Sequence, residues 1–155
     1  MCSSDLVDRI IAGGTPTTPI HAAGGNIECG AGTTILWDSG QPTVCPDQDF
    51  LHAAILLIRV ISKPTSDRLC FDLGHKAVAS EMPHPRVQIL GLPDAKFVGH
   101  SEEHLVVETA SAASIPVGSV FYAIPRHVCP TVALHSEVYV VTEGRATDQI
   151  GRAHV

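Results

Sequence analysis

Short apolar runs separated by turn residues fill the chain from residue 53 onward, and this pattern constrains the fold more than any other feature. The 155-residue sequence holds 13 Gly and 11 Pro, and the runs between them are rich in Val and Ile. Such runs suit strands joined by turns. We therefore predict a mainly β fold, a small barrel or sandwich. The predicted strands are 53–62, 68–73, 86–91, 96–99, 103–109, 118–124 and 135–142, the last ending at a turn around Glu143 and Gly144.

The part before these strands has a different composition. The segment AGGTPTTPIHAAGGNIECGAGTT is mostly Gly, Thr, Ala and Pro, so it offers little to a core and we expect most of it to be loop. The run 53–62 also fits a buried helix by periodicity alone. A chain of this length that is 45% hydrophobic can bury one core, which predicts one principal domain.

Both ends of the chain look foreign to this pattern. The segments MCSSDL and QIGRAHV resemble translated sequencing-adaptor sequence. An ordinary frayed terminus is the alternative. We therefore expect residues 1–6 and 149–155 not to belong to the native fold, and we expect the chain to be a fragment that lacks an N-terminal part.

Charge and hydropathy argue against several classes of partner. The formal net charge is −6, the pI is near 5.8, and Lys and Arg form no run. We therefore expect neither nucleic acid nor a membrane as partner. The longest apolar stretch, AAILLIRVI, is about half the length of a membrane-spanning helix. The start lacks a secretory signal, and five widely spaced cysteines suit reduced thiols, so a cytoplasmic location is expected.

A candidate metal site lies in the stretch AIPRHVCPTVAL. If this segment is a strand or a strand end, His127 and Cys129 point to the same face and can reach one ion together. Imidazole and thiolate suit zinc. Two ligands fall short of the four of a structural zinc site, so an ion here would be catalytic, with its other ligands from elsewhere. The alternative is that the two residues are ordinary neighbours on a strand.

Three further clusters carry chemically useful side chains. In IIAGGTPT, a short strand runs into Gly13, Gly14 and Thr15, whose backbone N–H groups and hydroxyl can approach a phosphate; a plain turn is the alternative. In FDLGHKAVASE, Asp72 and Lys76 flank a glycine at a strand end, where they are further candidates for a pocket rim and a structural turn is the default. In GHSEEHLVV, four side chains form a candidate pocket rim or a solvated loop. These four are His100, Glu102, Glu103 and His104.

Together, and in this order, these stretches resemble the C-terminal part of the D-threonine aldolase and D-serine dehydratase family. The resemblance rests on GGTPT, RVISKPTSDRLCFDLGHKAVASE, GHSEEHLVVE, VFYAIPRHVCPTVAL and VVTEGR, and it runs from about residue 10 to residue 148. It implies a fold-type III, alanine racemase-like enzyme in which a C-terminal β domain completes the site of an N-terminal α/β barrel. On this basis residues 7–20 would be a remnant of the last barrel strand, 21–48 a linking loop and 49–148 the β domain.

The resemblance also implies cofactors and a reaction. Pyridoxal 5'-phosphate would bind through its phosphate to Gly13, Gly14 and Thr15, and a metal ion would bind His127 and Cys129. The His-x-Cys form is similar to the zinc-dependent D-serine dehydratases, whereas D-threonine aldolases carry His-x-Asp and use manganese or similar ions. The cofactor would act as electron sink for a D-3-hydroxyamino acid while the ion holds the substrate hydroxyl. The intact enzyme would be a homodimer.

One departure from the family bears on activity. The lysine that holds the cofactor as a Schiff base lies near the start of the barrel, and Lys63, Lys76 and Lys96 do not match it. We therefore expect the chain alone to lack lyase activity. The competing hypothesis is a self-standing small β-barrel that binds a ligand without metal.

Overall fold

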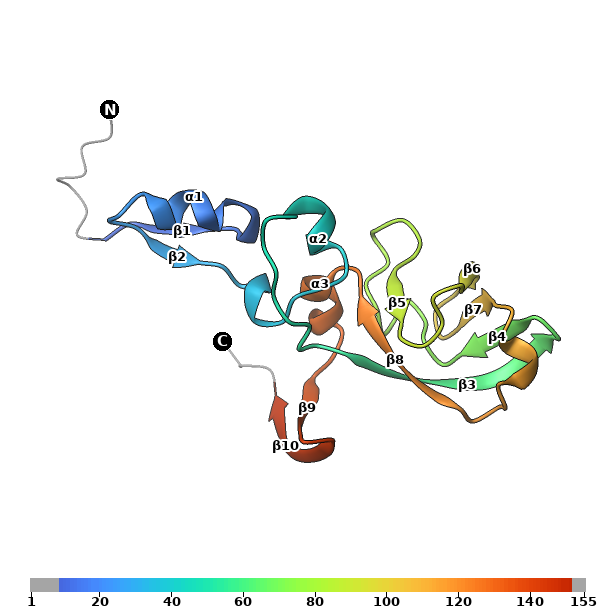
Figure 1. Ribbon diagram of the computed structural model, residues 1–155. Coiled ribbons are helices and arrows are strands. Elements are labelled where there is room, and N and C mark those ends of the chain that lie inside the picture. Colours follow the sequence, from blue (N-terminus) through green and yellow to red (C-terminus); the bar gives the residue numbers. More distant parts are fainter. Residues whose placement is uncertain (1–8, 152–155) are drawn as a thin grey trace.

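The structure is a computed structural model that describes residues 9–151 (Figure 1). The segment 1–6 and the last residues of 149–155 therefore lie outside the described part. The helices are α1 (Thr18–Ala23), α2 (Gln41–Val44) and α3 (Val128–Ala133), with 3-10 turns η2 (Thr15–Thr17), η3 (Thr33–Ile35) and η4 (Ala112–Ser114). The strands are β1 (Ile11–Gly13), β2 (Glu28–Gly30), β3 (Leu56–Thr65), β4 (Arg68–Phe71), β5 (Val87–Ile89), β6 (Lys96–His100), β7 (Leu105–Glu108), β8 (Val120–Pro125), β9 (Glu137–Thr142) and β10 (Arg145–Gly151).

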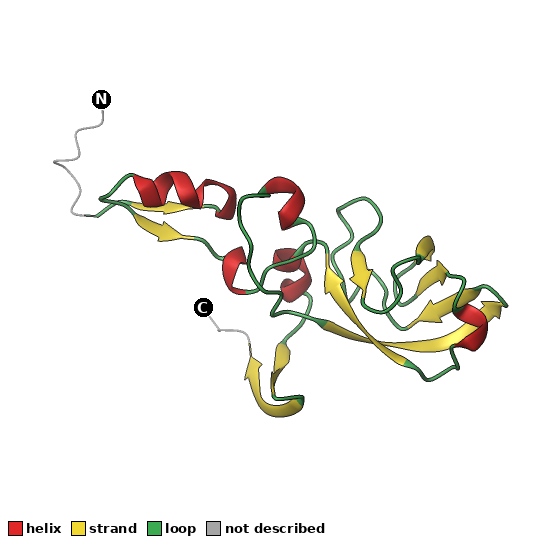
Figure 2. Ribbon diagram, viewed as in Figure 1, coloured by secondary structure: helices red, strands yellow, loops and turns green. Residues whose placement is uncertain are grey.

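A curled six-stranded antiparallel sheet forms the main body (Figure 2). Its strand order is β5-β8-β3-β4-β7-β6, and it has the shape of half a barrel. The mainly β prediction is thus confirmed, and all seven predicted strands are present. The run 53–62 is a strand from Leu56 and not a helix. The seventh, β9, does not join the sheet but pairs with β10 in a separate hairpin.

The curl of the sheet follows from local irregularities in its ladders. The register between β3 and β4 shifts twice, between Val60 and Thr65, and the β6–β7 register shifts once, between Phe97 and Gly99. Such bulges bend a strand and increase its twist. The concave face buries one apolar cluster, which is the hydrophobic core. Its members are Ile58, Val60, Leu69, Phe71, Leu73, Val78, Val87, Ile89, Leu92, Leu105, Val107, Ala112 and Ala123.

A small βαβ unit precedes the sheet. Strand β1 pairs with β2 in parallel, and α1 provides the crossover that a parallel pair needs. This is the repeating arrangement of α/β barrels. The composition had indicated mostly loop here. The structure instead forms short elements, because Pro16 and Pro19 lie in the first turns of η2 and α1, where their fixed φ favours helix.

The β9–β10 hairpin is the last element of the described residues. Its turn lies at Glu143 and Gly144, as predicted, with φ of 51° and 75°. Strand β10 was not predicted, and it continues to Gly151, inside the segment set aside as a foreign end. Among residues 9–151, no helix has the length and apolar character needed to cross a membrane.

Candidate functional site

The His127 and Cys129 pair lies at the end of strand β8, at its junction with helix α3. His127 is the N-cap of α3, with extended φ and ψ of −135° and 105°, and Cys129 is in the first helical turn. Pro130 follows in the same turn, where its missing N–H removes no helical hydrogen bond. The chain therefore turns into a helix between the two side chains.

A buried carboxylate fixes the start of α3. Asp38 is 1% exposed, and it accepts backbone N–H bonds from Val128 at 2.8 Å, Gln41 at 2.9 Å and Gly40 at 3.1 Å. These donors lie at the N-terminal ends of α2 and α3, where a negative charge is favourable. Sequence reasoning missed Asp38, although Asp two or three residues before a helix is a recognisable capping signal.

The segment 77–82 supports α3 from another side. The N–H of Ala79 donates to Thr131 Oγ1 at 3.1 Å, and His135 Nε2 lies 2.8 Å from the carbonyl oxygen of Ala77. In the same segment Glu81 Oε1 lies 2.5 Å from His127 Nδ1. The imidazole of His127 is thus engaged through Nδ1, so Nε2 is the ring nitrogen left for a ligand.

Cys129 is exposed, and Thr33 Oγ1 lies 3.5 Å from its sulfur. Its thiol and the imidazole of His127 are the two side chains of the junction whose donor atoms suit a metal ion. Within residues 9–151, no group of three or more His, Cys, Asp or Glu side chains is placed to hold an ion. The donor chemistry therefore fits an open site for a thiophilic ion such as zinc, in which these two residues supply part of the coordination.

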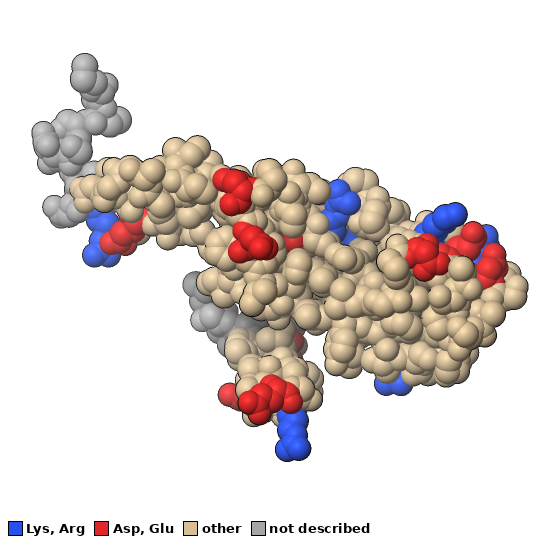
Figure 3. Space-filling view, in the orientation of Figure 1, with Lys and Arg blue, Asp and Glu red and all other residues tan. Residues whose placement is uncertain are grey.

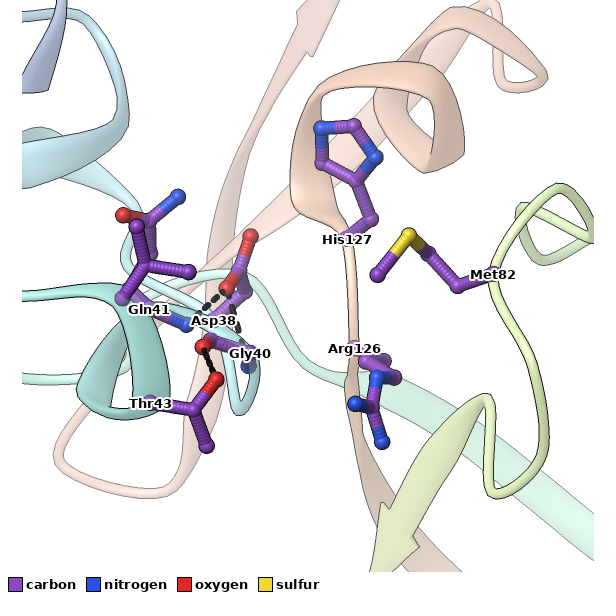
Figure 4. Close-up of a pocket in the computed structure, with 8 residues that line it drawn as sticks. Asp38, Gly40, Gln41, Thr43, Met82, Arg126 and His127 are labelled. Atoms are coloured by element: carbon purple, nitrogen blue, oxygen red, sulfur yellow. Dashed lines mark hydrogen bonds between the residues drawn. The ribbon is translucent and has the colours of Figure 1, made fainter.

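A cavity of about 200 Å³ lies beside His127. Figure 4 shows Asp38, Gln41 and Thr43 on one side of it and Met82, Arg126 and His127 on the other. Gly40 lines the cavity and packs closely against Arg126, because a Cβ there would overlap the carbonyl oxygen of Arg126.

The Glu81 carboxylate is held ionised in this environment. Partial burial acts to raise its pKa, but its own backbone N–H, the hydrogen bond with His127 and the nearby Arg86 charge together lower the pKa below the usual value. An ionised Glu81 is a strong acceptor for an imidazole N–H.

The clusters around residues 72–76 and 100–104 come together, but as a surface ion-pair network. Lys76 Nζ lies 3.0 Å from Glu102 Oε2 and 2.9 Å from Glu103 Oε1. Hydrogen bonds to these two carboxylates raise the pKa of Lys76, and the bond from Lys76 lowers the pKa of Glu103. Figure 3 shows acidic and basic groups gathered at the end of the molecule that carries β6 and β7. Asp72 instead accepts the Arg59 N–H at 2.7 Å.

His100, a member of the predicted rim, contacts Arg86, which follows the segment 77–82 in the same loop. Its Nδ1 lies 2.9 Å from Arg86 Nη1, and the rings of His84 and His75 lie 5.6 and 6.1 Å away. Burial, the Arg86 charge and the two neighbouring histidines lower the pKa of His100 to about 4. A neutral His100 therefore accepts a hydrogen bond from Arg86, while His104 lies exposed on the same loop.

Gly13, Gly14 and Thr15 lie where β1 ends and η2 begins, in the βαβ unit and not beside α3 (Figure 1). Gly14 has φ of 100°, and a Cβ there would lie 3.2 Å from Thr17 Oγ1. Thr15 is buried, and its carbonyl oxygen accepts a 2.9 Å bond from Gln48 Nε2. A glycine turn between a strand and a helix fits a phosphate in its general form.

Comparison with known proteins places this architecture in a class. The chain is 32% identical over 145 residues to a D-threonine aldolase of Arthrobacter sp., covering 91% of this chain and 38% of the aldolase. Among solved structures, the D-threonine aldolase of Filomicrobium marinum aligns with a TM-score of 0.74 at 20% identity, covering 86% of this chain and 37% of that one. The D-threo-3-hydroxyaspartate dehydratase of Delftia sp. aligns with a TM-score of 0.72 at 20% identity, covering 95% and 44%.

The fold is therefore that of the C-terminal β domain in fold-type III enzymes, and the relatives are D-amino acid lyases. The sequence family described as "Putative serine dehydratase domain" matches residues 53–141, more than half of the chain. The chain belongs to this family. It spans less than half the length of the aldolase and dehydratase relatives.

Proposed function

We propose that the chain is the C-terminal portion of a pyridoxal phosphate- and metal-dependent lyase that acts on D-3-hydroxyamino acids. The reaction would be dehydration of D-serine or retro-aldol cleavage of D-threonine. The observation that supports this most is the His127 and Cys129 pair at the start of α3 in a domain of this family, with His127 lining a cavity.

The structural relatives add a specific argument. D-threo-3-hydroxyaspartate dehydratase has been solved as a histidine-to-alanine variant and, in metal-free form, as a cysteine-to-alanine variant, with the two replaced residues two positions apart. His127 and Cys129 have the same types and spacing. We infer that they bind the ion through His127 Nε2 and Cys129 Sγ. Their chemistry favours Zn²⁺, and Mn²⁺ or another divalent ion is the alternative.

The residues of this chain have three roles in the proposed reaction. His127 and Cys129 hold the ion, which when bound would polarise the substrate hydroxyl for elimination or for alkoxide formation. The turn at Gly13, Gly14 and Thr15 binds the cofactor phosphate. The cavity beside His127 receives the substrate. Met82 and Val44 contribute apolar side chains to its lining.

The lysines of the chain do not supply the group that holds the cofactor. Lys63 donates to the carbonyl oxygen of Ala113 at 3.0 Å, and Lys76 is engaged with two carboxylates. With pyridoxal phosphate and zinc added, we therefore expect the isolated chain to form no pyruvate from D-serine and no acetaldehyde from D-threonine. Turnover above a protein-free control would contradict this part of the proposal.

Metal content tests the site directly. After purification and exposure to equimolar Zn²⁺ followed by desalting, we expect the wild-type chain to retain zinc and Cys129→Ser to retain much less. Cys70→Ser serves as control, because this cysteine is buried in β4 away from the junction. Equal zinc retention in all three proteins would favour a β-barrel binding module without metal.

A further inference from the structure

Glu81 is the residue beside the proposed metal site whose role is unassigned. It lies in the loop between β4 and β5, with its side chain 46% exposed, and Oε1 is 2.5 Å from His127 Nδ1. The loop is anchored beside α3 through Ala79 and Thr131, so the position of the carboxylate is set by the same helix that carries the ligands.

We propose that Glu81 is a positioning residue for the metal ligand His127. Its carboxylate accepts the Nδ1–H of the imidazole, which fixes the tautomer with the Nε2 lone pair free and holds the ring in one orientation. This proposal rests on the proposed metal site, and it extends that site by one residue that does not touch the ion.

Two features make the arrangement effective. A neutral imidazole carries its proton on one nitrogen only, so an acceptor at Nδ1 leaves Nε2 as the ligand atom. The backbone of His127 is fixed as well, because Asp38 holds the next N–H at 2.8 Å and Thr131 Oγ1 donates to the His127 carbonyl at 2.7 Å. With the backbone fixed, the orientation of the His127 imidazole is the remaining degree of freedom, and the bond to Glu81 restrains it.

The same loop connects the ligand to the cavity. Met82 follows Glu81 and lines the cavity with His127. Arg86, four residues further on, places a positive charge near the carboxylate and bonds His100. The loop therefore orients the ligand with one residue and forms a cavity wall with the next.

The test uses the 155-residue chain and Zn²⁺ alone. Zinc affinity is measured by competition with a chromophoric chelator for wild type, Glu81→Gln, Glu81→Asp and the matched control Glu108→Gln. Glu108 is a carboxylate of comparable exposure that pairs with Arg68 on the sheet. We expect Glu81→Gln to weaken zinc binding by about 10–100-fold, the usual loss when such an outer partner is removed. Glu81→Asp should recover part of this loss, and Glu108→Gln should bind as wild type.

A second readout reports on the ring itself. In the metal-free protein, the ¹⁵N shifts and two-bond couplings of the His127 ring should show the proton on Nδ1 in wild type and a mixture of tautomers in Glu81→Gln. Circular dichroism confirms that each variant is folded, and if Glu81→Gln fails to fold, Glu81→Asp carries both measurements.

The outcomes separate the two proposals. If His127→Gln and Cys129→Ser bind zinc as tightly as wild type, the metal site is wrong and the role of Glu81 falls with it. If these two lose affinity and Glu81→Gln does not, only the role of Glu81 is wrong. A loss of affinity in Glu81→Gln with an unchanged tautomer would also overturn positioning, because the carboxylate would then act through its charge alone.

Discussion

The six-stranded sheet and the N-terminal βαβ unit use apolar residues in opposite ways. In the sheet, Val60, Leu69 and Phe71 are fully buried in a continuous core. In residues 9–30, Ile11 and Ile20 are 66% and 72% exposed, and Thr15 is the one buried residue of that described range. This difference shows that apolar content alone does not make a core. The side chains must also share a face that another element covers.

The proposed metal site lies beside the segment that joins the two regions. Trp37, Asp38 and Cys45, in the segment that joins them, are buried, and Asp38 bonds the first N–H of α3. Trp37 packs against Phe50 with ring centroids 5.1 Å apart. The ligands thus depend on a segment that belongs to neither the sheet nor the βαβ unit.

The largest expected effect contrasts Phe71→Ala with Ile11→Ala. Phe71 is fully buried and contacts Phe121 edge-to-face at 5.7 Å. Its removal should lower the free energy of unfolding by about 3–5 kcal/mol through lost burial and a residual cavity. Ile11→Ala should change it by less than about 0.5 kcal/mol. Urea unfolding followed by circular dichroism measures both. Equal losses would show that β1 is packed as firmly as the sheet.

Two glycines contrast a crowded backbone position beside the sheet with an open position in the segment that follows β2. A Cβ on Gly74 would meet the carbonyl oxygen of Glu102 at less than van der Waals distance, whereas a Cβ on Gly32 would meet no heavy atom within 4 Å. Gly74→Ala should therefore cost about 1–3 kcal/mol or more by overpacking. Gly32 has φ of −68°, so Gly32→Ala should be neutral or stabilise by up to about 1 kcal/mol. Denaturation midpoints that change equally would contradict this.

The sequence allowed the sheet to be predicted because its information is local. Alternating apolar residues and turn residues mark each strand, as in Ile58 and Val60, which are buried around the exposed Arg59. The short strand before Gly13 was expected and is β1, but its partner β2 was missed because a three-residue strand carries too little of this pattern. The start of a helix at Val128 was not predicted, because it depends on Asp38, which lies 90 residues from Val128 in the chain.

The candidate site could be predicted only in part, for the same reason. The ordered motifs led to His127 and Cys129, and their role as metal ligands remains a prediction. Glu81 was within a quoted motif, yet nothing local indicates that it meets a histidine 46 residues away. Glu102 and Glu103 lie in a solvated loop, as charged residues usually do, and both pair with the exposed Lys76. Only the contacts between distant segments distinguish Glu81, which meets a proposed ligand, from Glu102 and Glu103, which meet a surface lysine.

The smallest expected effect is a pH dependence of the free energy of unfolding, which arises from His100 in the sheet. The pKa of His100 is lowered to about 4 by burial and the Arg86 charge, so the unfolded chain binds a proton at a higher pH than the folded one. The stabilisation by neutral His100 is then complete above about pH 6.5, declines as the pH falls toward 4, and is lost below that.

Because His100 is only partly buried, we expect a loss of about 1–2 kcal/mol over this range, which allows for solvent screening. The free energy of unfolding, measured by urea titration at several pH values between 8 and 4, should fall less steeply for His100→Gln than for wild type. His21→Gln, in α1, is the control: it should keep the wild-type slope because the βαβ unit contributes little to the folding free energy. A wild-type slope in His100→Gln would mean that the acid sensitivity arises elsewhere in the sheet domain. A reduced slope in His21→Gln would mean that the βαβ unit unfolds with the sheet.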